Sequence, residues 1–430
     1  PTRDLKDNPI ILVGDANLSK ALPIVGQSFY RHDYVRLWWP NQDYFNLTWD
    51  RIWNAIKDPS LRSAIFNIWF NRDYTDYAKV TNNDTLTLTT WEPSNRIHMF
   101  IRKDIVAQIW NYGVVPAPVD TTVTDPYQTK TVQLNPDLVV GSAGTEPGQF
   151  QSPRSMAFAP DGTFYVADSH NNRIQHLDAN GQVINVWGSY ADISTGDAPG
   201  GTFNEPWGVA VGPDGSVYVS DTWNNRIQKF GPDGTFVKMW GVFGQAETPD
   251  AFWGPRGLAV DAKGRLYVLD TGNKRVVVFD ADGNPVTEFG GAGMDAGKFD
   301  EPVGIAIDQE GLIYITDTWN QRIQVFSVGA DGVTFTPLRS WNVSAWYGES
   351  LDNKPFIAVD KQGNVYVTDP EAYRVLEFTS QGEIVRVWGD YSTGPDGFGL
   401  TSGIAVDPKG EVWVSDSVNN RLLRFLMPTE

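Results

Sequence analysis

The sequence contains no cysteine, which excludes disulfides, thiolate nucleophiles and every cysteine-based metal site. It has only 4 histidines, so little histidine-rich metal chemistry is available. Basic residues are outnumbered, with 34 Lys+Arg against 52 Asp+Glu and a net charge of −18. Such an acidic protein repels phosphate backbones, and we therefore expect no nucleic-acid partner. No apolar run reaches the roughly 18–20 residues needed to span a bilayer.

The chain is nevertheless long enough and apolar enough to bury substantial cores. It has 430 residues, of which 41% are hydrophobic. This length predicts two or three domains, or one large β domain with a smaller companion. The chain begins with Pro1 rather than methionine, so we expect it to be a piece of a longer protein.

Internal repetition is the strongest signal in the sequence. Six segments carry an Asp followed five residues later by an Arg, and successive aspartates lie 47 to 53 residues apart. A period near 50 is typical of a propeller or a solenoid. The six pairs are Asp168 and Arg173, Asp221 and Arg226, Asp270 and Arg275, Asp317 and Arg322, Asp369 and Arg374, and Asp416 and Arg421.

Each repeat reads as four short strands. In the second copy, turns such as Pro213-Asp214-Gly215 separate four apolar runs. These runs are Gly208–Val211, Ser216–Ser220, Arg226–Phe230 and Thr235–Trp240. Four antiparallel strands per repeat make a propeller blade, so six repeats predict a six-bladed β-propeller.

The two ends of the repeat region complement each other. The sixth repeat stops after its third strand, at Leu422–Leu426, whereas an unassigned strand-like run, Asp137–Gly141, precedes the first repeat. We predict that residues 131–142 complete the last blade and close the ring, which removes open sheet edges. Deleting them should open the ring.

The recurring Asp and Arg are interpreted as structural, because a ligand site rarely needs six copies. The Asp is expected to accept backbone N–H bonds in the turn that follows, and the Arg to pair with an Asp across or between blades. A buried pair of this kind costs about 3–5 kcal/mol to break from one side.

The pattern D-x-x-N-x-R-[IV]-x-x-F, preceded by G-[IVL]-A-[VI]-D-x-x-G, resembles the NHL repeat across residues 131–430. The fifth copy, residues 369–374, departs from it, and its turn is expected to be distorted. The resemblance implies several activities, among them a lyase that holds zinc with three histidines and a calcium-dependent lactonase. The propeller holds only His170 and His176, so the zinc site cannot be assembled.

The residues that lead into the first strands contain no carboxylate ligand for calcium. They are Arg154, Trp207, Arg256, Val303, Pro355 and Ser402. We therefore predict no metal, no cofactor and no catalytic residue.

A binding face is predicted where the loops into the first strands meet the loops between the second and third strands. Arg154, Trp207 and Arg256 are placed near the axis of this face, and His170, Trp223 and Trp319 on its loops. Aromatic rings beside charged groups suit a glycan, a glycolipid or a protein partner. The alternative is that each Trp wedges between blades.

Residues 1–112 predict a small α/β domain, and residues 113–130 a linker rich in Pro and Thr. The fold class is thus mainly β, a six-bladed NHL-type propeller preceded by a small α/β domain. The expected elements are strands at 9–13, 34–39 and 96–102, and helices at 17–30, at 49–56, from Asp58 and from Asp104.

This N-terminal part resembles the soluble tail of GT-C membrane glycosyltransferases related to the dolichyl-phosphate-mannose protein mannosyltransferases. The residues Leu37-Trp38-Trp39, Tyr44, Trp91–Pro93 and Phe100–Asp104 carry the resemblance. It implies an accessory piece in the periplasm or at the cell surface, tethered through a membrane region upstream. The catalytic carboxylate of such enzymes lies in that membrane region, so this fragment is expected not to be catalytic alone.

Two other functions compete with an extracytoplasmic module of a glycosylation system. One is a stand-alone protein-interaction scaffold. The other is a propeller hydrolase or lyase, which needs a convergent acid–base or metal constellation. No pair of carboxylates is singled out by its spacing for that role.

Overall fold

The computed structural model describes residues 10–14, 29–37, 49–71, 75–81, 95–102, 125–346 and 353–428. The chain divides into two compact units, Pro1–Val123 and Thr124–Glu430. Each unit is treated separately below.

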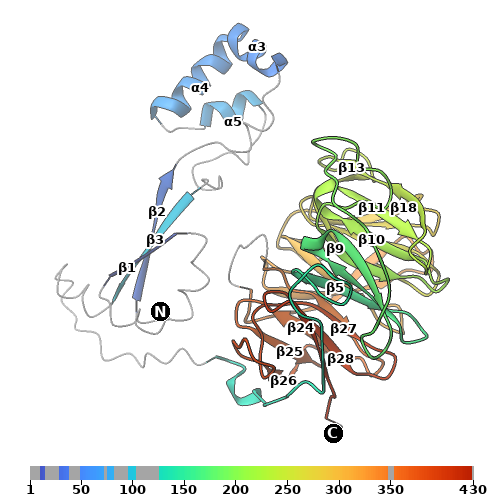
Figure 1. Cartoon of the computed structure of the whole chain (residues 1–430). Coiled ribbons are helices and arrows are strands. Elements are labelled where there is room, and N and C mark those ends of the chain that lie inside the picture. The colour runs from blue at the N-terminus through green and yellow to red at the C-terminus, as the bar shows by residue number, and fades with distance from the viewer. Residues whose placement is uncertain are drawn as a thin grey trace. The chain divides into compact units, whose positions relative to one another are not determined.

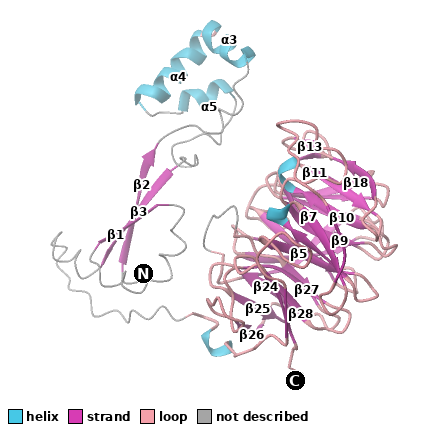
Figure 2. Ribbon diagram, viewed as in Figure 1, coloured by secondary structure: helices cyan, strands magenta, loops and turns pink. Residues whose placement is uncertain are grey.

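The second unit is a six-bladed propeller of four-stranded antiparallel sheets (Figures 1 and 2). Blade one is β5 Pro153–Phe158, β6 Phe164–Asp168, β7 Arg173–Leu177 and β8 Val183–Trp187; blade two is β9 Pro206–Val211, β10 Val217–Asp221, β11 Arg226–Phe230 and β12 Phe236–Trp240. Blade three is β15 Pro255–Val260, β16 Leu266–Asp270, β17 Arg275–Phe279 and β18 Pro285–Gly290; blade four is β19 Pro302–Ile307, β20 Ile313–Asp317, β21 Arg322–Val328 and β22 Phe335–Asn342. Blade five is β23 Ile357–Val359, β24 Val365–Asp369, β25 Arg374–Phe378 and β26 Ile384–Trp388; blade six is β27 Thr401–Val406, β28 Val412–Asp416, β29 Arg421–Phe425 and β4 Leu138–Val140. A two-stranded parallel ribbon, β13 Val242–Phe243 and β14 Ala251–Phe252, lies between blades two and three.

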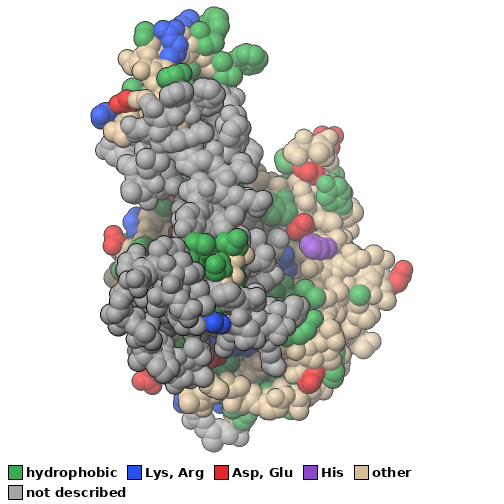
Figure 3. Space-filling model, turned by 90° about the vertical axis from the view of Figure 1, so that its left-hand side faces the viewer, with side chains coloured by type: hydrophobic (Ala, Val, Ile, Leu, Met, Phe, Trp, Pro, Cys, Tyr) green, Lys and Arg blue, Asp and Glu red, His purple; other side chains and the backbone are tan. Residues whose placement is uncertain are grey.

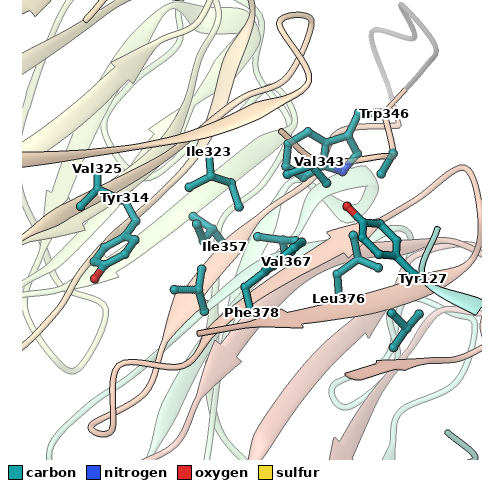
Figure 4. Close-up of a cluster of buried hydrophobic side chains, with 13 residues drawn as sticks. Tyr127, Tyr314, Ile323, Val325, Val343, Trp346, Ile357, Val367, Leu376 and Phe378 are labelled. Carbon is teal, nitrogen blue, oxygen red and sulfur yellow. The ribbon is translucent and has the colours of Figure 1, made fainter. Parts of the chain in front are cut away.

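The second strand of every blade is buried along its whole length. A sheet with one solvent-exposed face would alternate buried and exposed residues along each strand. Here the neighbouring blades cover both faces of the second strand. Accordingly, the apolar core consists of layers between adjacent blades. Figure 4 shows the layer between blades four and five, where Tyr314 and Ile323 face Val367 and Phe378.

The strand predicted to close the ring does so. β4 pairs antiparallel with β29, with Val140 opposite Leu422 and Val139 opposite Leu423. Val140 is buried in the layer that blades six and one share. The Asp137 carboxylate also pairs with the Arg424 guanidinium at 2.5 Å, so blade six is joined by side chains as well as by the ladder.

Residues 125–130, the part of the predicted linker 113–130 that the structure describes, pack against the propeller. Tyr127 is buried against Phe378 of blade five, and η4 (Gln128–Lys130) follows it. The backbone N–H of Val132 then donates to the Val387 carbonyl at 2.8 Å. The reason is that blade five offers an apolar surface that an aromatic ring can cover (Figure 4).

The described part of the first unit contains three strands and three helices. β1 (Ile10–Gly14), β3 (Asn95–Arg102) and β2 (Phe29–Leu37) form an antiparallel sheet with β3 in the centre. The helices are α3 (Trp49–Lys57), α4 (Pro59–Asn71) and α5 (Thr75–Thr81). None of the helices described is long and apolar enough to cross a membrane.

The predicted N-terminal elements compare with these as follows. The Asp58 carboxylate accepts the Ser60 N–H at 2.8 Å at the start of α4, where the helix was expected to begin. The helix expected over 17–30 falls largely outside the described residues, but Phe29 and Tyr30 open strand β2 instead. α5 was not predicted, because seven residues are too few for a clear helical period. The expected helix from Asp104 lies outside the described residues.

Val140→Asp should lower the free energy of unfolding of the propeller by about 3 kcal/mol, because it buries a carboxylate in the layer that closes the ring. Val139, its neighbour on the same strand, is exposed, so Val139→Asp is the matched control and should cost under about 1 kcal/mol. Urea unfolding of both variants measures the difference. Equal stabilities would contradict a closing role for β4.

Candidate functional site at the axis

The predicted face is set by strand direction. The start of each first strand lies beside the end of the second strand, as with Pro206 opposite Asp221. The loops into the first strands therefore share one end of the blades with the loops between strands two and three. We call this end the loop face.

The repeated Asp–Arg pair forms inside each blade, not between blades. Asp221 is fully buried, and its carboxylate accepts bonds from Arg226 Nε at 2.7 Å and from the backbone N–H of Asn204 at 2.7 Å. Asn204 precedes the first strand, so the Asp binds the backbone of that loop. It also holds the turn that follows it, since the Asn224 side-chain amide donates to the same carboxylate at 3.0 Å. Arg226 also donates to the carbonyl of Thr202 in the same loop. The six Nε–carboxylate distances run from 2.7 to 2.9 Å.

Blade five keeps the pair despite its divergent turn. Arg374 Nε lies 2.8 Å from Asp369, and Tyr373 takes the left-handed conformation (φ 57°) that Asn225 takes in blade two. The Arg374 guanidinium has an additional ion pair with Asp125, in the segment that precedes the closing strand. This segment thus supports the blade whose own sequence departs from the repeat.

Close approach of the first strands brings the axial residues together. A Cβ atom at Gly208 would lie 2.0 Å from the Arg256 carbonyl oxygen, so only glycine allows this contact. Ser220 Oγ joins the same two strands, since it accepts the Gly208 N–H at 2.7 Å and donates to the Arg256 carbonyl at 2.7 Å.

Three of the predicted residues meet at the axis. Trp207 is fully buried, and its ring centroid lies 3.5 Å from the Arg154 guanidinium carbon and 4.6 Å from that of Arg256. Both arginines are also buried. Trp207 thus packs within the molecule and offers no exposed surface to a ligand, in line with the wedge alternative.

Two residues that sequence reasoning missed complete the axial cluster. Glu301 Oε1 lies 2.6 Å from the Arg256 guanidinium and 3.0 Å from Lys354 Nζ. Lys354 takes the place of the proline that begins the first strand in blades one to four. A lysine at a position that is proline in four other repeats could have indicated from the sequence that this residue has a special role. We call Arg154, Trp207, Arg256, Glu301 and Lys354 the axial cluster.

Burial and charge set the protonation of this cluster. Burial lowers the pKa of Lys354 to about 8, and the charge of Arg256 acts in the same direction while Glu301 opposes it. Burial disfavours ionisation of Glu301, but Lys354 and Arg256 outweigh it and hold the pKa of Glu301 below its ordinary value. The cluster is therefore a set of mutual contacts, with its single carboxylate shared by two cations.

The remaining predicted residues lie on loops. Trp319 is half-buried, and Lys354 Nζ lies 4.8 Å from its ring centroid. The His170 imidazole lies 3.8 Å from the Glu205 carboxylate near the surface. Trp223 is 38% exposed and lies in the loop between β10 and β11.

A cavity of about 230 Å³ lies along the first strands of all six blades. None of the residues that line it has an ionisable side chain, so it offers no acid–base pair and no charged ligand for a metal. Within the described ranges, no group of three or more His, Asp or Glu side chains is arranged to hold a metal ion. Each blade contributes one alanine: Ala157, Ala210, Ala259, Ala306, Ala358 and Ala405.

Comparison with known families identifies NHL repeats in the propeller. The NHL repeat matches residues 150–177, 203–230, 252–279, 299–326 and 402–425. These segments lie in blades one to four and six, and blade five, with its divergent turn, is not among them. The chain therefore contains NHL repeats that form a six-bladed propeller, as predicted.

Several curated proteins resemble part of the chain. Peptidyl-glycine alpha-amidating monooxygenase A of Xenopus laevis is 37% identical over 111 residues, 24% of this chain and 12% of that protein. Protein SUPPRESSOR OF QUENCHING 1 of Arabidopsis thaliana is 34% identical over 80 residues, 18% of this chain and 8% of that protein. The chain thus spans about an eighth or less of the length of these relatives.

Solved propellers resemble it at lower identity. A gluconolactonase from Xanthomonas campestris is 15% identical, covers 70% of this chain and 98% of its own, and has a TM-score of 0.47. A streptogramin B lyase is 15% identical, covers 69% and 97%, and has a TM-score of 0.44. The resemblance to a glycosyltransferase tail is not shown by these comparisons and stays a prediction.

Lys354→Met should remove a rise in stability at alkaline pH. Between pH 8 and 10.5 the unfolded chain holds the Lys354 proton and the folded chain does not, so wild type gains stability as pH rises through this window. From pH 7 to pH 10, wild type should gain about 2 kcal/mol relative to the variant.

Urea unfolding at both pH values measures this gain, and groups that titrate in both proteins cancel. The exposed Lys361 supplies the control, since Lys361→Met should track wild type. Parallel pH profiles for wild type and Lys354→Met would rule out a buried lysine at the axis.

Proposed function

We propose that this chain is a non-catalytic recognition module whose loop face binds a protein partner. The observation that carries the proposal is the set of large apolar side chains exposed on the loops of that face. They are Tyr190, Ile193, Trp223, Val242, Phe243, Trp253, Met294, Tyr391 and Val418. Exposed apolar side chains gathered on one face are typical of interaction sites, because a soluble surface otherwise disperses them.

The ribbon between blades two and three holds part of this surface. Phe243 of β13 is exposed, and its ring meets that of Trp253 edge to face at 6.2 Å. Figure 3 shows hydrophobic side chains exposed on the propeller loops. Two packed aromatic rings supply large apolar area at a low cost in conformational entropy, as interface anchors do.

The axial cluster supports recognition rather than catalysis. Its arginines, lysine and glutamate are buried and contact one another, and the cavity along the axis has no ionisable lining. The hydrolase or lyase alternative needs an accessible acid–base pair, and the His170–Glu205 pair at 3.8 Å is the candidate that it would use.

A glycan or glycolipid is the second candidate ligand. Five exposed members of the surface are aromatic, namely Tyr190, Trp223, Phe243, Trp253 and Tyr391, and flat rings stack on sugars. Ile193, Val242 and Met294 have no such ring, which is why we place a protein partner first. A role beside a membrane glycosyltransferase, outside the cytoplasm, rests on the N-terminal resemblance alone and is proposed with it.

Phe243→Ser combined with Trp253→Ser should weaken partner binding by about 30-fold or more, since loss of an anchor costs about 2 kcal/mol. The partner is captured by cross-linking to the full chain in an envelope extract of the source organism, and its affinity is then measured by calorimetry. Val286→Ser removes an exposed apolar side chain from strand β18, away from these loops, and is the matched control.

A glycan array probed with wild type and Trp223→Ala separates the two ligand classes. Glycan binding that Trp223→Ala abolishes would favour the second candidate over the first. Partner binding unaffected by the Phe243 and Trp253 changes would refute the proposed surface.

A further inference from the structure

The helices of the first unit expose apolar side chains of their own. In α3, Trp49, Trp53 and Ile56 recur at intervals of four and three residues, which places them on one side of the helix. Trp49 is 84% and Trp53 57% exposed, so most of the surface of each ring is open to solvent. Lys57 and Asn54 lie at other positions of the same helix and are exposed too.

Helix α4 contributes to the same kind of surface. α3 and α5 both contact α4, and Ala64 of α4 is fully buried. Ile65, the residue after it, is exposed. Figure 3 shows hydrophobic side chains projecting from these helices with Lys and Arg side chains beside them. We call Trp49, Trp53, Ile56 and Ile65 the apolar helix surface.

We propose that the apolar helix surface inserts into the headgroup region of a lipid bilayer, with α3 lying along the membrane plane. Short helices with separated apolar and polar sides, Trp and Phe on the one and Lys or Arg near the other, are those that lie in membrane interfaces. This inference does not depend on what the propeller binds.

Length argues for lying on the membrane rather than crossing it. α3 has 9 residues and α4 has 13, so they are about 14 and 20 Å long against a hydrocarbon core of about 30 Å. Tryptophan is also the side chain that concentrates at the level of the headgroups, since its ring is apolar and its N–H is polar.

The net charge of the helices also favours binding to a lipid bilayer. Residues 49–71 hold Arg51, Lys57 and Arg62 against Asp50 and Asp58, which gives +3 − 2 = +1, whereas the whole chain has a net charge of −18. The Lys57 ammonium lies 5.4 Å from the Trp53 ring centroid, at the border of the apolar side. A cation at that border can reach lipid phosphates while the ring beside it is buried.

The test is partition of the full chain into vesicles of phosphatidylcholine and phosphatidylglycerol at about 4:1. Wild type should sediment with the vesicles, and Trp49→Ser with Trp53→Ser should lower the partition coefficient by at least about tenfold. Val286→Ser removes an exposed apolar side chain of the propeller outside the loop face and should leave partition unchanged within about twofold. Circular dichroism checks that the double variant keeps its helices.

A second measurement needs no variant. Tryptophan fluorescence of wild type should shift to the blue on mixing with vesicles and should be quenched by lipids brominated near the headgroup. Failure of wild type to bind the vesicles, or equal binding by the double variant, would overturn the proposal. So would a change from dimer to monomer caused by the double variant without vesicle binding, since the surface would then join two copies of the chain.

Discussion

No blade of the propeller is a complete unit, because its apolar faces are covered by the blades on either side. The second strands are buried throughout, and the core is divided into layers that belong to pairs of blades. A ring satisfies this constraint only if it closes, so the layer between blades six and one depends on β4 and Val140. The loop face and the axial cluster exist because closure directs all six first strands toward one axis.

Near the axis, glycine recurs in four of the six blades at the position where neighbouring first strands touch, namely Gly208, Gly257, Gly304 and Gly403. Gly208 lies so close to the next strand that no other residue fits, and Ser220 joins the two strands by hydrogen bonds. Blade five departs from this pattern with Lys354 and Phe356 at the positions of proline and glycine. The buried Lys354 ammonium pairs with Glu301, so the axial end of blade five carries an ion pair where blades one to four have a proline.

The sequence predicted those features that repeat. Six copies of Asp and Arg at one spacing indicated the blades, and the missing strand of the sixth copy indicated β4. The sequence did not predict contacts that form between different blades. Trp207 is buried by Arg154 and Arg256, which come from the two neighbouring blades. Glu301 pairs with Lys354 across the boundary between blades four and five. Tyr127 was assigned to a linker because a single aromatic ring carries no periodic signal, and only the surface of blade five explains its burial.

The path of the chain into the ring has a mechanical consequence. Residues that enter the propeller first meet blade five, where Asp125 pairs with Arg374 and Tyr127 is buried, and only then reach β4 at the outer edge of blade six. A tension applied through the N-terminal unit would load this ion pair and this ring before it could peel the outermost strand. The contacts of Asp125 and Tyr127 with blade five therefore protect the pairing of β4 with β29 against a force applied from the N-terminal side.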